Sequence, residues 1–247
     1  MEEELYDTNY AMFEFGLRGE TQLQDNLTYS NIPLKTVFDV GANIGEWKRM
    51  LRDRQPDAEV HMFEPMPNTF RKQLINNGII DNKTINNPFG LGKEPGFIDV
   101  VYDPTNDRLT SAVTELPRKS PTYRPIMLLD GDTYCKIHQI DHIDYLKIDT
   151  EGWEMNVLRG FNHMLQERKI EAIQFEFGFA NILTKDLLLD YYRLFDPLDY
   201  VIGRVTQEGV RFKRYDWEDE DWRGPDFLAV KREREDIISA TQVHQSS

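Results

Sequence analysis

Residues 143–154 read Ile-Asp-Tyr-Leu-Lys-Ile-Asp-Thr-Glu-Gly-Trp-Glu, and this stretch decides the fold class. Its first half, residues 143–149, is apolar enough to form a buried strand, and a helix is expected to follow over about 153–168. A packed core does not need three acids within six residues, so some of them must face a cleft, solvent or a cation. We therefore predict a buried strand whose carboxyl end opens into a functional site.

The rest of the chain alternates short apolar strands with helices of about 10 to 15 residues. This alternation predicts an α/β fold with a mainly parallel sheet that helices cover on both faces. Further strands are expected over 35–40, 58–63, 82–87, 97–102, 170–177, 199–205, 209–215 and 226–231. Further helices are expected over 44–54, 67–77 and 184–195.

Three regions fall outside this regular pattern. Residues 1–34 are expected to form an N-terminal helical segment, with a helix over 5–20, that serves as a lid, an acceptor contact or a dimer contact. The stretch 103–125 is rich in Pro, Thr and Arg and is expected to be an excursion or lid within the main domain, residues 35–231. Residues 232–247 are polar and are expected to fray.

Composition excludes several classes of protein. The 247 residues include 29 Lys+Arg and 43 Asp+Glu, which gives a formal net charge of −14, and 40% are hydrophobic. That apolar share suits one large packed domain, and the acidic balance argues against a nucleic-acid binder, which needs clustered basic residues. Cys135 is the single cysteine, so neither a disulfide framework nor a cysteine-based zinc site is possible.

The start of the chain, Met1-Glu2-Glu3-Glu4, lacks the basic region and apolar stretch of a signal peptide. No run of about 18 apolar residues occurs, so no membrane span is expected. The sequence therefore predicts a cytoplasmic protein.

A glycine turn, Asp39-Val-Gly-Ala-Asn-Ile-Gly45, separates the strand over 35–40 from the next helix. Small residues there let a ligand approach the backbone, and ligands of open α/β sheets bind beyond the carboxyl ends of the strands. Asn43 and Glu46 replace two glycines of the dinucleotide-binding pattern, and Asp39 and Glu46 would repel a pyrophosphate. The turn favours a cationic ligand without phosphate, such as S-adenosylmethionine, although a purely structural turn remains an alternative.

Glu64 ends the second strand, 25 residues after Asp39. An acid at this place can accept hydrogen bonds from both ribose hydroxyls of a nucleoside. The alternative is an acid that the dipole of the following helix favours near its start. Glu176, in the phrase Gln174-Phe-Glu-Phe-Gly178, ends the strand after residues 143–149, so Asp149, Glu151 and Glu176 are expected to converge.

Together these motifs resemble the FkbM family of S-adenosylmethionine-dependent methyltransferases. The resemblance covers roughly residues 35–180 in order and rests on Val37–Gly45, Phe63–Pro65, Ile143–Glu154 and Phe175-Glu176. It implies a Rossmann-like class I methyltransferase fold with a seven-stranded sheet and an antiparallel last strand, which Asp226–Val230 would form. It also implies methyl transfer to a hydroxyl of a sugar, a glycan or another small hydroxylated metabolite, and it makes residues 35–231 the methyltransferase domain.

The resemblance assigns roles to the residues above. Asp39, Gly41, Asn43 and Gly45 would shape the methionine pocket and Glu64 would hold the ribose. An alcohol needs a base or a cation to lose its proton, and carboxylates supply either one. The candidate catalytic residues are Asp149 first, then Glu151 and Glu176, and Asp149 and Glu176 are candidate ligands of a divalent cation such as Mg²⁺.

Structural alternatives stand beside these roles. Glu151 and Glu154 also suit acids near the start of a helix, and Lys147 on the buried strand is expected to form a structural ion pair. The acidic run Asp216–Trp222 is interpreted as a solvated loop, with a sugar-binding platform as the sharper alternative.

The whole protein also has alternatives. An NAD-dependent oxidoreductase shares the topology, although Asn43 and Glu46 disfavour it, and a non-catalytic cofactor-binding module would keep Gly41 and Glu64. A homodimer is a further expectation.

Overall fold

The computed structural model describes residues 19–76, 81–103, 106–115 and 121–243. The helix expected over 5–20 falls almost entirely outside these residues. The first described helix is α2, Glu20–Tyr29, which buries Leu23 and Leu27 on one side.

An eight-stranded sheet forms the centre of the molecule, in the order β11-β10-β12-β9-β8-β1-β2-β3. The strands are β1 Thr36–Val40, β2 Glu59–Phe63, β3 Thr84–Asn87, β8 Ile143–Ile148, β9 Ile170–Gly178, β10 Tyr200–Thr206, β11 Gly209–Phe212 and β12 Arg223–Lys231. Strands β3, β2, β1, β8 and β9 are parallel, and β12 runs antiparallel between β9 and β10. The predicted α/β fold with an antiparallel last strand is confirmed.

The strand count of seven is wrong for the described sheet. The additional edge strand is β11, which pairs antiparallel with β10 as a hairpin through Thr206 and Gly209. The local sequence did predict a strand over 209–215. The error therefore comes from the count of seven strands that the resemblance implied for the sheet.

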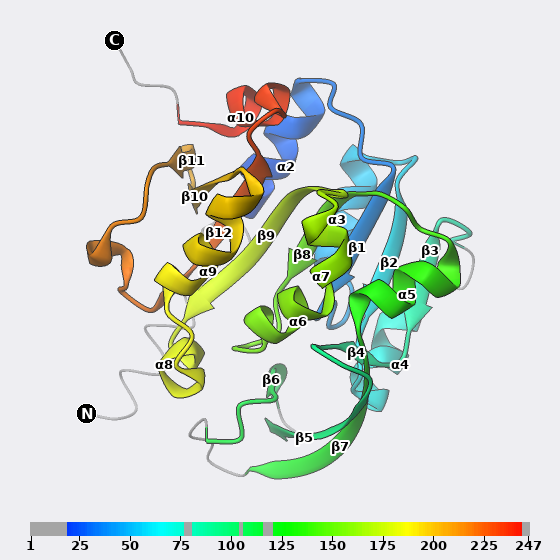
Figure 1. Ribbon diagram of the computed structural model, residues 1–247. Helices are drawn as coiled ribbons and strands as arrows, with labels where there is room; N and C mark the ends of the chain where they lie inside the picture. The colour runs from blue at the N-terminus through cyan, green and yellow to red at the C-terminus, as the bar shows by residue number, and fades with distance from the viewer. Residues whose placement is uncertain (1–18, 77–80, 104–105, 116–120, 244–247) are drawn as a thin grey trace.

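Helices cover both faces of the sheet (Figure 1). They are α2, α3 Glu46–Arg54, α4 Pro67–Asn76, α5 Gly131–His138, α6 Glu154–Gly160, α7 Asn162–Gln166, α8 Ala180–Thr184, α9 Leu188–Phe195 and α10 Glu235–Thr241, with short 3-10 turns at Asp196–Leu198 and Trp217–Asp219. One apolar core includes Phe38, Leu158 and Phe175, and a second includes Trp47 and Leu228. The sheet is therefore buried on both faces, as parallel sheets usually are.

A second, four-stranded sheet occupies much of the region where an excursion was expected. Its order is β4-β7-β5-β6, from β4 Gly90–Leu91, β5 Gly96–Asp103, β6 Asn106–Ser111 and β7 Thr122–Leu129. Figure 1 shows it below the carboxyl ends of the parallel strands. Strand β7 was missed because Thr122, Arg124 and Pro125 hide its alternation, in which Ile126 and Leu128 are buried.

The expectation that residues 232–247 fray is wrong for 235–241, which form α10. Ile237 on this helix is 1% exposed, and α10 packs against α2. The polar composition misled the prediction, because α10 places Ile237 in the core and packs Ile238 and Ala240 against it.

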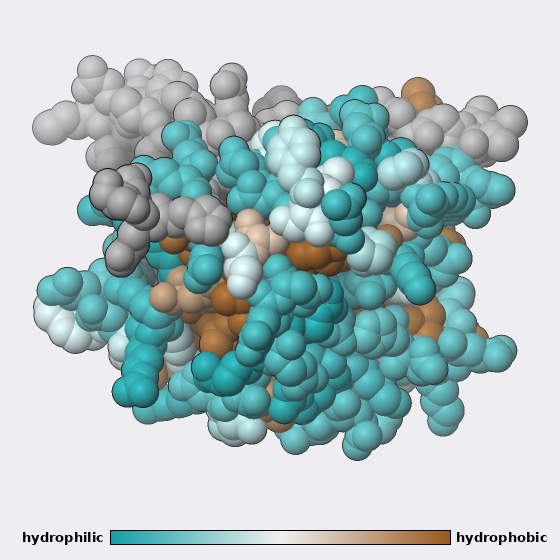
Figure 2. All heavy atoms as spheres, turned by 90° about the horizontal axis from the view of Figure 1, so that it is seen from above, coloured by the Kyte–Doolittle hydropathy of each residue, from teal (hydrophilic) through white to brown (hydrophobic). Residues whose placement is uncertain are grey.

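The outer surface is mainly hydrophilic on the side viewed in Figure 2, with hydrophobic atoms gathered in a few recesses. None of the helices in the described part of the chain has the length and apolar character that a membrane crossing needs.

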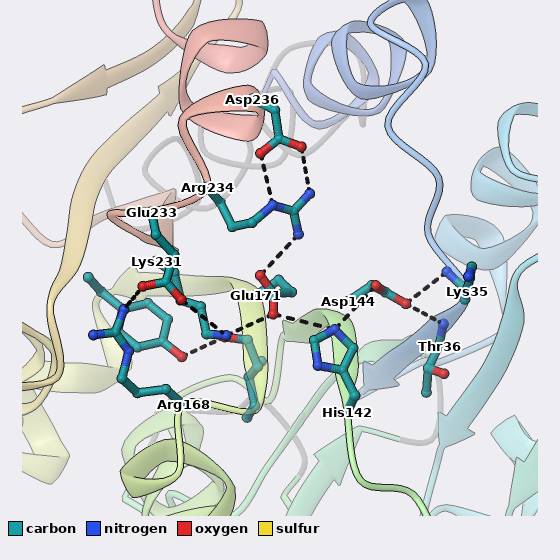
Figure 3. Close-up of polar contacts among 12 residues, drawn as sticks. Lys35, Thr36, His142, Asp144, Arg168, Glu171, Lys231, Glu233, Arg234 and Asp236 are labelled. Carbon is teal, nitrogen blue, oxygen red and sulfur yellow. Dashed lines mark hydrogen bonds and ion pairs between the residues drawn. The ribbon is translucent and has the colours of Figure 1, made fainter.

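A polar network ties the sheet together at the amino ends of its parallel strands (Figure 3). Glu171 on β9 is 6% exposed and accepts hydrogen bonds from Lys231 Nζ at 2.8 Å and from the Arg234 guanidinium at 3.0 Å. His142 Nε2 lies 3.4 Å from Glu171 and 3.5 Å from Asp144, whose carboxylate accepts two backbone N–H groups at the start of β1. These contacts fasten β1, β8, β9, β12 and α10 to one another.

We predict that Glu171→Gln lowers the free energy of unfolding by about 1–3 kcal/mol at pH 7, because two cations lose their buried anion. Burial alone would raise the pKa of Glu171, but hydrogen bonds from Lys231 and Arg234 outweigh burial and hold the pKa below its usual range. A lowered pKa gives stability above the pKa of the unfolded chain and loses it as the pH falls through the folded value. Urea unfolding should therefore show the difference from wild type shrinking below about pH 4.

The matched control is Glu233→Gln. Its side chain is 57% exposed in the same network and contacts Arg168 and Lys231. It should cost less than about 0.5 kcal/mol. A difference between Glu171→Gln and wild type that stays constant down to pH 3 would contradict the assigned ionisation.

Candidate functional site

The glycine turn after β1 is held between the two neighbouring strands. The backbone N–H groups of Gly41 and Ala42 both donate to the carbonyl of Phe63 at 3.1 Å, at the end of β2. Gly41 has a φ of +83°, and a Cβ there would lie 1.8 Å from the backbone oxygen of Asp149. Only glycine fits, because the ends of β1 and β8 meet at this point.

Glu64 joins this turn through its side chain. It is 6% exposed, and its Oε2 accepts a hydrogen bond from the backbone N–H of Asn43 at 3.1 Å. Its Oε1 accepts from the N–H of Met66 at 2.7 Å. Asn43 adopts a left-handed φ of +47°, which asparagine tolerates, and Gly45 follows at +81° as α3 begins. The structure thus brings the turn and Glu64 together, as the sequence predicted.

Asp39 lies on β1 just before the turn and is fully buried. Within the described residues, neither of its carboxylate oxygens has a hydrogen-bond partner, and the nearest cation is Lys147, with Nζ 4.0 Å from Oδ1. Burial raises the pKa of Asp39 to about 7, although Lys147 acts in the opposite direction. A buried carboxylate without hydrogen-bond donors is costly and indicates a place where a cationic or donating ligand fits.

Lys147 on β8 forms the ion pair that the sequence predicted. Its Nζ lies 2.9 Å from Asp149 Oδ2 and 5.8 Å from the centre of the Trp47 ring. Burial would lower the pKa of Lys147, but the carboxylates of Asp149 and Asp39 outweigh burial and raise the pKa above its ordinary value. Lys147 therefore remains an ammonium that faces both the glycine turn and the end of β8.

Asp149, Glu151 and Glu176 converge beside Lys147, as expected from their strand ends. One carboxylate oxygen of each lies within 4.8 Å of those of the other two. The side chain of Asp149 is 32% exposed, whereas Glu176 is 7% exposed, so the cluster is open to solvent on the Asp149 side. Like charges at this spacing favour a bound cation or a shared proton.

Glu154 holds the loop that carries these acids. Its Oε1 accepts hydrogen bonds from the N–H and the hydroxyl of Thr150, at 2.8 and 2.9 Å, and from the N–H of Gly152 at 3.2 Å. Burial raises its pKa to about 7 despite these hydrogen bonds. Glu154 thus has the structural role that its place at the start of α6 indicated.

Two further contacts at the site were missed by sequence reasoning. Ser111, at the end of β6, donates its hydroxyl to the backbone carbonyl of Glu151 at 2.6 Å. On the other side, Gln174 Nε2 donates to Glu20 at 2.6 Å and to Asp226 at 3.1 Å. No motif marks either contact, because each joins residues that are at least 40 positions apart.

The acidic run Asp216–Trp222 mostly serves the fold. The Glu220 carboxylate accepts the N–H groups of Leu188 and Leu189 at the start of α9, at 2.9 and 3.0 Å. Asp219 and Asp221 pair with Lys213 and Arg204, both at 2.8 Å. The interpretation as a simple solvated loop is therefore incomplete, because three of the acids also hold other parts of the fold.

Comparison with known proteins places the motif-bearing region in a defined family. Residues 39–191 match the family described as the Methyltransferase FkbM domain. The hexuronic acid methyltransferase AglP of Haloferax volcanii is 26% identical over 194 residues, which are 76% of this chain and 78% of that protein. Methyltransferase 1 of Beauveria bassiana is 26% identical over 144 residues, which are 51% of this chain and 58% of that protein.

Two solved structures are similar at low sequence identity. The plantazolicin methyltransferase BpumL, in complex with SAH, has a TM-score of 0.46 and 12% identity, covering 94% of this chain and 91% of its own. The precorrin-6y C5,15-methyltransferase of Geobacter metallireducens has a TM-score of 0.44 and 9% identity, covering 85% and 86%.

We predict that Gly41→Ala lowers the free energy of unfolding by more than about 2 kcal/mol, because the methyl group meets the Asp149 carbonyl and the left-handed φ disfavours alanine. Gly96→Ala is the matched control, since a Cβ there has no atom within 4 Å. Thermal and urea unfolding of both variants check this. Equal stability of the two variants would show that β1 and β8 do not meet as closely as described.

Proposed function

Because the chain belongs to the FkbM methyltransferase family, we propose that it transfers the methyl group of S-adenosylmethionine to a hydroxyl of a sugar, a glycan or another small hydroxylated metabolite. Methyltransferase activity follows from the family, and it sets aside the NAD-dependent oxidoreductase alternative. The donor, the acceptor and the residue roles below are the proposal.

The observation that carries the donor is the buried carboxylate of Asp39 beside a glycine turn, which accepts no hydrogen bond from the residues that the structure describes. S-adenosylmethionine brings a sulfonium and an ammonium and no phosphate, so it would add positive charge and hydrogen-bond donors beside the Asp39 carboxylate. Asp39, Gly41, Asn43 and Gly45 would hold its methionine end, where the absence of side-chain bulk at Gly41 and Gly45 leaves the backbone accessible.

Glu64 would hold the ribose. Each of its carboxylate oxygens already accepts one backbone hydrogen bond, which fixes the side chain at the end of β2. A carboxylate is a good acceptor for the two neighbouring hydroxyl groups of a ribose.

When bound, the donor supplies a methyl group on a good leaving group, and the protein must place and deprotonate the acceptor oxygen. Asp149 would accept the proton of the attacking hydroxyl, and Glu151 and Glu176 would hold neighbouring hydroxyl groups. Lys147 Nζ, 2.9 Å from Asp149 Oδ2, would hold that carboxylate in place. The proton thus ends on Asp149 and passes to solvent on its exposed side.

A sugar acceptor is supported from two directions. AglP, which matches 76% of this chain over 78% of its own length, is named for its action on a hexuronic acid. The three carboxylates suit a hydroxyl-rich acceptor, which needs a base and offers hydrogen-bond donors.

We also propose that Asp149 and Glu176 are ligands of Mg²⁺, with Glu151 as the third carboxylate. Oxygen ligands are those that Mg²⁺ prefers, and the three side chains meet within 4.8 Å. Residues 1–34 as an acceptor or dimer contact, and 35–231 as the catalytic domain, remain proposals as well.

Two substitutions separate donor binding from turnover. Glu64→Ala should weaken S-adenosylmethionine binding about 10-fold to 100-fold, because two charged hydrogen bonds to the ribose are lost. Asp149→Asn should leave donor binding within about threefold and lower kcat by about 100-fold to 10,000-fold, because the base is lost while its shape remains. Isothermal titration and a methyl-transfer assay against a sugar panel measure both.

The controls are Glu59→Ala, at the other end of β2, and Asp141→Asn, just before β8, both on exposed residues. Neither should change binding or turnover by more than about twofold. Full turnover by Asp149→Asn would remove the proposed base, and unchanged donor affinity in Glu64→Ala would remove the ribose contact.

The metal proposal has its own test. A chelator should lower kcat at least about tenfold, and added Mg²⁺ should restore it, because a cation that lowers the acceptor pKa is lost and regained. In Glu176→Gln, the Mg²⁺ concentration for half-maximal rate should rise. Turnover that ignores both chelator and Mg²⁺ would leave Asp149 acting as a base without a metal.

A further inference from the structure

Ser111 is a buried hydroxyl that connects the small second sheet to the acidic loop. It is 1% exposed, at the end of β6. Its Oγ accepts the N–H of Val113 at 2.9 Å and donates to the carbonyl of Glu151 at 2.6 Å. The hydroxyl therefore has a defined orientation, with its proton directed at the backbone of a residue in the acidic cluster.

Glu151 occupies a conformation that needs such support. Its φ is +54°, in the left-handed region that is unfavourable for a non-glycine residue, and Gly152 follows at +101°. The nearby carboxylates of Asp149 and Glu176 also repel its side chain. Both effects favour a loop that relaxes and turns Glu151 away.

Two anchors oppose this relaxation. Glu154 binds the N–H groups of Thr150 and Gly152, on either side of Glu151, and Ser111 binds the carbonyl of Glu151 itself. The end of β6 also packs on the loop, because a Cβ on Gly152 would lie 2.9 Å from Val113 Cγ2. The loop is thus held from α6 on one side and from the second sheet on the other.

We propose that Ser111 is a positioning residue for Glu151, through which the second sheet sets the geometry of the acceptor-binding carboxylates. The inference rests on the proposed function for its effect on turnover, but the contact acts on the loop whatever the acceptor is. Ser111 should influence the acceptor half of the reaction and leave donor binding at the glycine turn unchanged.

Amide hydrogen exchange tests the contact without any methyl transfer. In Ser111→Ala, the amides of residues 150–153 should exchange about fivefold to tenfold faster, which corresponds to the loss of one hydrogen bond. The amides of residues 41–45 should not change. Thr122→Ala, on β7 of the same sheet, is the control and should change neither group. Unchanged exchange at 150–153 in Ser111→Ala would overturn the proposal.

A second pair of variants guards against a general loss of stability. Ser111→Thr and Ser111→Val add the same volume and differ only in the hydroxyl. Exchange at 150–153 should be faster in the valine variant than in the threonine variant. Equal exchange in both would show that packing, and not the hydroxyl, holds the loop.

Kinetics test the role in turnover. Ser111→Ala should lower kcat about fivefold to tenfold and leave the donor affinity within about twofold. In a Glu151→Gln background, the same change at Ser111 should add less than about twofold, because its target has already been altered. Equal losses in both backgrounds would overturn the positioning role.

The two proposals fail separately. If wild-type protein transfers no methyl group to any sugar but Ser111→Ala speeds exchange at 150–153, the contact stands and the proposed function falls. If wild-type protein is active and Ser111→Ala changes neither exchange nor kcat, the proposed function stands and the positioning role falls.

Discussion

The ion pairs of the buried Lys147 ammonium are the interactions on which the rest of the site depends. The ammonium lies 2.9 Å from Asp149 and 4.0 Å from Asp39, and thus links the end of β8 to the end of β1. Removing one partner from such a group leaves an uncompensated buried charge, which is usually far more costly than the pair itself is stabilising. The position of Lys147 follows from the parallel register, in which Asp39, Lys147 and Gln174 are neighbours across three strands. The fold and the site therefore share one row of side chains.

Carboxylates gather along this row in the part of the chain that the structure describes. Burial would lower the pKa of Lys147, but the carboxylates of Asp149, Asp39, Glu20 and Asp226 outweigh burial and raise the pKa. At the β9 end of the row, the side-chain amide of Gln174 donates hydrogen bonds to both Glu20 and Asp226 and so holds these two carboxylates. An edge of this kind receives a cation more readily than an anion. This is the physical reason for a sulfonium donor, and it agrees with the absence of a phosphate-binding glycine pattern from the turn.

The sequence predicted what local motifs and strand order determine. The convergence of Asp149, Glu151 and Glu176 could be predicted because parallel strands end at the same edge of the sheet. Glu64 could be placed near the glycine turn because it ends the neighbouring strand. Contacts that neither a motif nor a strand end marks could not be predicted. Ser111 lies in a stretch without a motif, and β7 alternates too weakly around Pro125 to be recognised as a strand. The helix α10 depends on the burial of Ile237, which composition does not reveal.

The two sheets position their parts of the site by different means, and this explains why one part was predictable and the other was not. The main sheet fixes the glycine turn through close backbone contact, as the approach of Gly41 to the Asp149 carbonyl shows. Such constraints leave a mark in the sequence, because only glycine satisfies them. The second sheet acts through a hydroxyl and a carbonyl, and many sequences can present a hydroxyl at that place. The part of the site that is proposed to contact the acceptor is therefore fixed by less specific chemistry than the glycine turn, and its sequence carries a weaker mark.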